Sequence, residues 1–321
     1  MERKTKRIVI LAIFSIFFIS IILTSYAIFR SSQEVVKTPT GAPVPTNALP
    51  TGPSFIPIKH IIFIAFENKN YDSVVTAGPY FKYLADTYGR ATQAYDIHNI
   101  CGGTSRSLPS YLTVTSGSPF NKCGTDNFTA GEFDTKNIFS LVNDAGMTWA
   151  QYAEGISGPC STKGTKFAAR HVPALFYRNI LQNSDINYCK NHVVPLTDWY
   201  NMISSGQMPP NFAFISPDLC NDAHDCSVPT ADNWLKNTFN LPNLLTKSWA
   251  QNTVFFIWFD EGYGKPGYFV VVSPYSMGRQ NTEIVSNYNI LTTMEWLLGL
   301  DSSGNNDDAN KTSPMKDLFG Q

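Results

Sequence analysis

Two pairs of oxygen-bearing residues, Glu67-Asn68 and Asp260-Glu261, each stand directly after an apolar run of this sequence. Carboxylates that converge on one point repel each other unless a cation lies between them. Carboxylate and amide oxygens suit a divalent ion such as Mg²⁺, Ca²⁺ or Mn²⁺, and Zn²⁺ as well if a histidine joins them. A single acid in such a position often only begins a loop or caps a helix. Because there are two pairs, we predict that Glu67, Asn68, Asp260 and Glu261 form a divalent-metal site.

A hydroxyl-rich turn that starts with Gly102-Gly103 leads through Ser107 into an apolar segment. If that segment is a helix, hydroxyls and free backbone N–H groups lie at its N-terminus, where phosphate binds and an attacking alkoxide is stabilised. Ser107 is therefore a candidate nucleophile, and the forked guanidinium of Arg106 is a candidate phosphate ligand. The alternative interpretation of this turn is a simple helix cap.

The segment 216–226 surrounds His224 with several acidic residues, including Asp225. A loop this rich in titratable groups is more often functional than structural. His171, which is followed by Val172-Pro173, is a second candidate for contact with a phosphate or for protonation of a leaving group. A lone histidine is usually a satisfied core or surface residue, so the interpretation of His171 depends on the other motifs.

These residues need elements that bring distant parts of the chain together. Continuous apolar runs, typical of strands covered on both faces, occupy 60–66, 253–259 and 268–272, and weaker strand patterns occupy 148–152 and 212–215. Helical patterns occur at 80–88, 108–115, 137–145, 196–205, 234–238 and 288–298. This alternation predicts an α/β fold with a mostly parallel sheet and helices on both faces. Ligands of such folds bind beyond the carboxyl ends of the strands, which is where both acid-containing pairs fall.

The N-terminus has the pattern of a membrane anchor. Basic residues within 1–7 precede an uncharged run, 8–29, that is long enough to cross a bilayer. These basic residues outnumber those just after the run, which predicts a cytoplasmic N-terminus and an outward-facing remainder at the cell membrane. The alternative is a long signal peptide cut near Tyr26-Ala27, which would make the protein secreted. We expect a cytoplasmic basic segment (1–7), a single transmembrane signal anchor (8–29), a Pro-, Thr- and Ser-rich linker (30–57) and a catalytic domain (58–321).

Charge and cysteine content agree with a domain outside the cytosol. The net charge of -1 argues against nucleic acid as a partner, because binding to phosphate backbones needs a positive field. All six cysteines lie in the part predicted to face outward, which favours disulfides. The sequence does not determine their pairing, although Cys220 and Cys226 are close enough to close one loop. A zinc site built from cysteines is the alternative, but no Cys-x-x-Cys pair supports it.

Taken in order, these segments resemble the phosphoesterase family that contains bacterial and fungal acid phosphatases and the non-haemolytic type of phospholipase C. Those enzymes are similar in fold to the alkaline phosphatase superfamily. The matching motifs, short singly but jointly specific, are Glu67-Asn68-x-x-Tyr71-Asp72, Ser107-x-Pro109-x-Tyr111-Leu112 with Thr115-Ser116-Gly117, His171-x-Pro173, Pro217-Asp218-x-Cys220-Asn221-Asp222-x-His224-Asp225-Cys226 with Asp232-x-Trp234-Leu235, Asp260-Glu261-Gly262 and Ser273-Pro274-Tyr275.

The resemblance implies an alkaline phosphatase-like three-layer sandwich in which Ser107 becomes phosphorylated and His171 and His224 serve the phosphate or the leaving group. It also implies that the two acid-containing pairs hold the metal. Asn68, Arg106 and Asp225 complete the candidate site as substrate contacts. The chain departs from the family in two places: many relatives begin the serine motif with His-Pro, and many carry a longer polar insertion where 262–267 is short.

We therefore predict an extracytoplasmic phosphate-ester hydrolase, of acid phosphatase or phospholipase C type, that is tethered to the membrane. The alternative is a non-catalytic surface domain that retains the fold. A sulfatase is a third interpretation, but that class normally requires Cys/Ser-x-Pro-x-Arg, and the sequence after Ser107 lacks this arginine.

Overall fold

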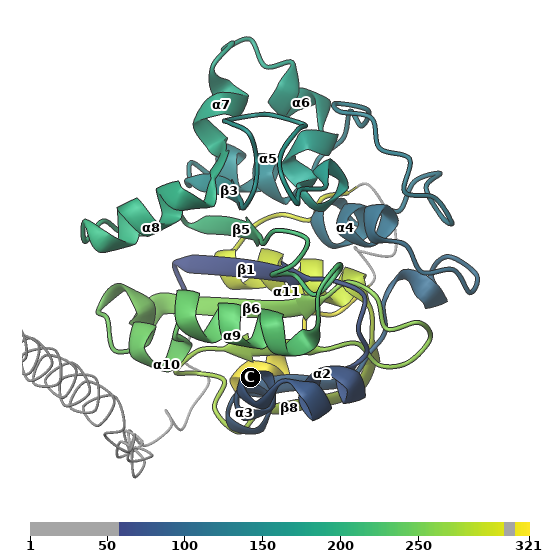
Figure 1. Ribbon diagram of the computed structural model, residues 1–321, viewed down its shortest axis with the longest axis vertical. Helices are drawn as coiled ribbons and strands as arrows, with labels where there is room; N and C mark the ends of the chain where they lie inside the picture. Colours follow the sequence, from purple (N-terminus) through teal and green to yellow (C-terminus); the bar gives the residue numbers. More distant parts are fainter. Residues whose placement is uncertain (1–57, 305–311) are drawn as a thin grey trace, which may run out of the picture. The chain divides into compact units, whose positions relative to one another are not determined.

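The computed structural model describes residues 58–304 and 312–321, and its centre is a sheet of order β4-β3-β5-β1-β6-β7-β2-β8 (Figure 1). Every neighbouring pair is parallel except where β7 meets β6 and β2. The mostly parallel α/β sheet predicted from the sequence is confirmed. The strands are β1 (His60–Phe66), β2 (Gly89–Ala94), β3 (Trp149–Ala153), β4 (Val193–Pro195), β5 (Phe212–Ser216), β6 (Thr253–Phe259), β7 (Phe269–Val272) and β8 (Gln280–Val285).

Helices cover both faces of this sheet, and Figure 1 shows α9 in front of it and α11 behind. Side chains of β1 alternate between two apolar cores: Ile61 and Phe63 pack with α4, α5 and α11, whereas Ile62 and Ile64 pack with α3, α8 and α9. This alternation follows from the two-residue repeat of a strand and produces three layers. The helices are α2 (Tyr71–Ala77), α3 (Pro79–Thr87), α4 (Ser107–Ser116), α5 (Ile138–Asp144), α6 (Arg178–Leu181), α7 (Tyr188–His192), α8 (Leu196–Ser204), α9 (Val228–Thr238), α10 (Leu241–Leu244) and α11 (Asn287–Leu298), with 3₁₀ turns η1 (Ile97–Asn99), η2 (Ala169–His171), η3 (Pro173–Phe176), η4 (Trp249–Asn252) and η5 (Lys316–Phe319).

The strands that the sequence revealed are those covered on both faces. β1 and β6 coincide with the predicted runs, and every residue of both is buried. Strands β2, β4 and β8 were not predicted, since they are short or partly exposed; Ile284 on β8 is 77% exposed. Helix α9 begins six residues before the predicted 234, with Pro229 in its first turn, where proline is well tolerated.

Helix α4 lies within a core, and all of its residues are buried. Its N-cap residue, Arg106, makes no capping hydrogen bond through its side chain. Instead the distant Asp126 accepts a hydrogen bond from the backbone N–H of Leu108 at 3.0 Å, which satisfies one free donor of the first turn. Gly117 ends the helix at φ 75°, a left-handed conformation that glycine adopts easily. The first residue of this helix, Ser107, is therefore held in a rigid surrounding.

Three disulfides settle the pairing that the sequence left open: Cys101–Cys123, Cys160–Cys189 and Cys220–Cys226. The last of these is the predicted closure of the loop that carries His224. The expected basic segment, anchor and linker, residues 1–57, lie outside the described residues. In 58–304 and 312–321 the structure has no helix with the length and apolar character that a bilayer crossing requires.

Candidate active site

The carboxyl ends of β1 and β6 place the two acid-containing pairs side by side. The strands are parallel and adjacent, with Phe66 opposite Phe259, so Glu67 and Asp260 leave the sheet together. The backbone N–H of Asn68 donates to Asp260 Oδ1 at 2.9 Å. Asn68 has a φ of 55°, so the chain turns sharply after Glu67. The structure thus brings together the residues of the predicted metal site.

The hydroxyl of Ser107 faces two of these carboxylates. Its Oγ lies 2.9 Å from Glu67 Oε2 and 3.3 Å from Glu261 Oε1, so it can donate its hydrogen to either. The other carboxylate oxygen of Glu67 accepts a hydrogen bond from the hydroxyl of Tyr111, one turn further along α4. The candidate nucleophile and the acids predicted as metal ligands therefore form one buried cluster.

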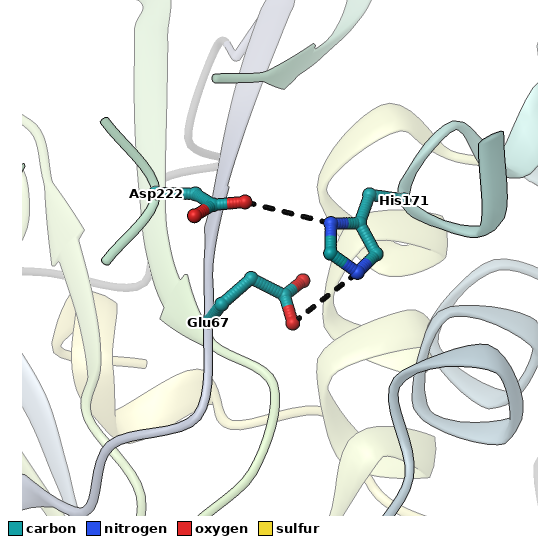
Figure 2. A group of neighbouring side chains, drawn as sticks. All are labelled: Glu67, His171 and Asp222. Carbon is teal, nitrogen blue, oxygen red and sulfur yellow. Dashed lines mark ion pairs between the residues drawn. The ribbon is translucent and has the colours of Figure 1, made fainter. Parts of the chain in front are cut away.

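Figure 2 shows His171, on η2, between two carboxylates. Its Nε2 lies 3.4 Å from Glu67 Oε2 and its Nδ1 lies 3.4 Å from Asp222 Oδ2. One ligand atom from each of these three residues lies within 4.8 Å of the others, close enough for a shared cation. Asp222 was not among the predicted site residues. The sequence feature that could have identified Asp222 is its position two residues before His224, within the acidic loop.

His224 lies at the edge of this cluster and is linked to Asp225. Its Nδ1 is 2.7 Å from Asp225 Oδ1, and its ring centroid is 5.7 Å from that of His171. On the other side, its Nε2 lies 3.3 Å from Nη2 of Arg170. Arg106 differs from these residues, because its side chain is exposed and makes no hydrogen bond or ion pair with the described part of the chain.

Asp96 joins the two loops that carry the reacting groups. Its Oδ2 accepts hydrogen bonds from the backbone N–H of Gly262 at 2.6 Å and from Ser105 Oγ at 3.1 Å, and Oδ1 accepts from the N–H of His98 at 2.9 Å. Gly262 follows Glu261, and Ser105 comes two residues before Ser107. This buried carboxylate therefore fixes the spacing between the nucleophile and the metal-ligand loop, a role for which the sequence offered no signal.

Burial and mutual repulsion set the protonation of the acids. Burial, with the charge of Asp222, raises the pKa of Glu67 well above its usual range, and burial, with the charge of Glu67, does the same to Asp260. Burial, reinforced by the charge of Asp260, raises the pKa of Glu261 to about 8, and burial raises the pKa of Asp222 to about 8. Burial lowers the pKa of His171 well below its usual value. A cation among these groups would relieve the repulsion that raises the four carboxyl pKa values.

The donor atoms of this cluster fit a divalent cation. Asn68 Oδ1 and Asp260 Oδ2 are buried side-chain oxygens that have no hydrogen-bond partner. Buried polar atoms normally have a partner, so two such oxygens beside two further carboxylates indicate that something else pairs with them. Oxygen donors of this kind are what Mg²⁺, Ca²⁺ or Mn²⁺ prefer, and the adjacent His171 also suits Zn²⁺.

The sheet with helices on both faces and the buried serine–carboxylate cluster define a class, enzymes of α/β fold that hydrolyse phosphoric esters. The chain belongs to the phosphoesterase family, whose sequence model matches residues 76–301. It is 25% identical to a phosphatidylinositol-3-phosphatase of Mycobacterium tuberculosis, over 85% of each chain. It is 27% identical to a probable acid phosphatase of Kluyveromyces lactis over 63% of this chain, but it spans only 47% of that relative.

Two solved structures share the fold. A protein of the alkaline phosphatase superfamily from Vibrio parahaemolyticus superposes with a TM-score of 0.54 at 13% identity, over 77% of this chain and 67% of the other. A phosphonate monoester hydrolase from Silicibacter pomeroyi superposes with a TM-score of 0.53 at 11% identity, over 82% of this chain and 77% of the other. These two structures show the fold, whereas the family model and the curated relatives confirm the predicted family and the predicted hydrolase activity on phosphoric esters.

Proposed function

We propose that this protein is a membrane-anchored, outward-facing phosphomonoesterase in which Ser107 is the nucleophile. The observation that carries the proposal is the position of Ser107 Oγ at the N-terminus of α4, within hydrogen-bonding distance of Glu67 and Glu261. Relatives named as phosphatases support the monoester, and a phospholipase C-like diesterase is the alternative.

The chemistry proceeds in two displacements. The Ser107 hydroxyl gives its proton to Glu67 or Glu261, Oγ attacks phosphorus, and the ester oxygen leaves with its electron pair. His171 is the proposed proton donor to that oxygen, after which water attacks the phosphoserine and releases phosphate. Glu67, Asn68, Asp260 and Glu261 are the proposed holders of a divalent cation. When bound, such a cation lowers the pKa of a nearby hydroxyl and offsets negative charge on phosphoryl oxygens.

The proposed location rests on the N-terminal sequence and on the cysteines. Residues 8–29 have the length and composition of a transmembrane anchor, and 30–57 those of a tether. Disulfides persist mainly in oxidising compartments, and the three disulfides of the described domain support a position outside the cytoplasm. We propose a single-pass protein of the cell membrane, secreted if its anchor is cleaved.

Substitution of one serine tests the catalytic proposal. The detergent-solubilised full chain, supplied in turn with Mg²⁺, Ca²⁺, Mn²⁺ and Zn²⁺, is assayed with p-nitrophenyl phosphate and with bis-p-nitrophenyl phosphate. Loss of a nucleophile should lower kcat at least about a thousandfold in Ser107→Ala. Ser116→Ala is the matched control, since this serine is equally buried at the other end of α4 and bonds to the carbonyl of Leu112.

Each outcome has a definite meaning. Faster hydrolysis of the monoester by the wild type supports a phosphomonoesterase, and faster hydrolysis of the diester supports the alternative. Turnover that survives in Ser107→Ala at the rate of Ser116→Ala would exclude the serine as nucleophile. No turnover of either ester with any of the four ions would contradict the proposed function.

A further inference from the structure

The guanidinium of Arg170 has no anionic partner although it stands beside the reaction centre. Its Nε is buried without a hydrogen-bond partner, and its Nη2 contacts a ring nitrogen, His224 Nε2, at 3.3 Å. Among the described residues no carboxylate forms an ion pair with it. Arg178, by contrast, pairs with Asp134 at 3.4 Å. A partly buried guanidinium with a free donor is suited to bind an anion that carries two or more oxygens.

The contacts of His224 hold this guanidinium in place. Guanidinium nitrogens only donate hydrogen bonds, so Nε2 of His224 must accept from Arg170. The ring proton then lies on Nδ1, which donates to Asp225 Oδ1 at 2.7 Å. The backbone N–H of His224 donates to Asp222 Oδ1 at 2.7 Å, and the Cys220–Cys226 disulfide closes the loop. The imidazole is therefore fixed from two sides and orients Arg170.

Arg170 is also close to the proposed nucleophile. Its Nη2 contacts the ring of His224, which lies 5.7 Å from the ring of His171. Nε2 of His171 in turn lies 3.4 Å from the same Glu67 oxygen that Ser107 Oγ contacts at 2.9 Å. A phosphoryl group on Ser107 would therefore lie on the side of His171 and His224. The exposed side chain of Arg106 makes no comparable contact with the described residues.

We propose that Arg170 binds the phosphoryl oxygens of the substrate and that the Asp225–His224 pair positions its guanidinium. Arg170 thus takes the role that the sequence suggested for Arg106, and His224 acts through Arg170 instead of touching the leaving group. A monoester dianion has one more charged oxygen than a diester monoanion, so this contact favours monoesters. The anion's identity as a phosphate ester rests on the proposed function.

Binding of inorganic phosphate tests this independently of turnover. Calorimetry on the full chain with its divalent ion supplied measures the phosphate Kd of the wild type and of Arg170→Gln. Loss of a charge-assisted contact should weaken phosphate binding about ten- to hundredfold. Arg170→Lys should recover part of the affinity, because it restores the charge but not the fork. Arg178→Gln, which removes a guanidinium already paired with Asp134, is the matched control and should bind phosphate as the wild type does.

A double-mutant cycle tests the positioning role. If His224 acts through Arg170, the losses of phosphate affinity in His224→Gln and Arg170→Gln do not add in the double variant. Additive losses would overturn that role. An unchanged phosphate Kd in Arg170→Gln, or a loss found in Arg106→Gln in its place, would overturn the assignment of Arg170. A wild type that binds phosphate through Arg170 but hydrolyses no ester supports the binding site and contradicts the proposed function.

Discussion

Removal of the Asp96 carboxylate should lower both the stability of the domain and the rate of turnover, and each effect can be measured. Asp96→Ala leaves the backbone N–H groups of Gly262, Tyr263 and His98 without this side-chain acceptor. The hydroxyl of Ser105 keeps only its 3.3 Å contact with Nδ1 of His98. A hydrogen bond to a charged group contributes about 1.5–3 kcal/mol, and the four bonds share one carboxylate, so we expect a loss of about 3–5 kcal/mol in the free energy of unfolding. For a domain of this size that corresponds to a fall in Tm of roughly 10 °C.

The same substitution should impair turnover. Without Asp96, the turn before Ser107 and the loop after Glu261 are no longer tied together, and a displacement of about 1 Å at a reacting group can cost about a hundredfold in rate. We expect kcat for p-nitrophenyl phosphate to fall about ten- to hundredfold at a temperature well below the lowered Tm. Thermal unfolding by circular dichroism and steady-state kinetics on the same preparation measure both quantities.

Asp232→Ala is the matched control for this measurement. Asp232 is also a buried carboxylate that accepts backbone hydrogen bonds, from Phe81 at 2.8 Å and Tyr80 at 3.1 Å, but it serves the N-terminal turn of α3. Its loss should lower Tm and leave kcat unchanged. If Asp96→Ala behaves in the same way, with lower Tm and full kcat, the argument that Asp96 sets the catalytic geometry is wrong.

Two further predictions concern metal and pH. Addition of a divalent ion to chelator-stripped protein, at about one hundred times its Kd, should stabilise the fold by about 2.7 kcal/mol in thermal unfolding, and Asp260→Asn should abolish this gain; equal gains in both proteins would refute the metal assignment. Burial raises the pKa of Glu295 to about 7, above its usual 4.5, so the folded state binds this proton more tightly than the unfolded state. The stability that Glu295 contributes is thus complete below about pH 4.5 and lost as pH rises through about 7. Relative to Glu295→Gln, the wild type should lose stability between pH 5 and pH 8 in denaturant titrations, and a difference that does not change with pH would contradict this.

The parts of the site that the sequence revealed are those attached directly to buried strands and helices. The strand before Glu67 and the strand before Asp260 are covered on both faces, so they are continuous apolar runs whose ends can be located in the sequence. Ser107 was found because an apolar helix follows a hydroxyl-rich turn. In each case local sequence was sufficient, since burial and hydrogen bonding along one element leave a periodic pattern.

The residues that the sequence missed depend on contacts between distant elements. Asp96 follows β2, a partly exposed strand without an apolar run, and meets Gly262 only because β2 and β6 end at the same edge of the sheet. Asp222 lay in a recognised loop, but its distance to His171 depends on how that loop folds over β1. The sequence singled out Arg106 because it precedes Ser107, whereas the contact of Arg170 with His224 depends on how distant loops pack.

The sequence by itself determined the α/β class, the family and the positions of the acids and the serine, because these follow from patterns that hydrophobic burial imposes along a single strand or helix. The strand order, the pairing of the cysteines and the partners of Asp96, Asp222 and Arg170 were decided only by tertiary structure. These features arise when separate elements pack together, and the free energy of that packing depends on the relative positions of side chains that are far apart in the chain.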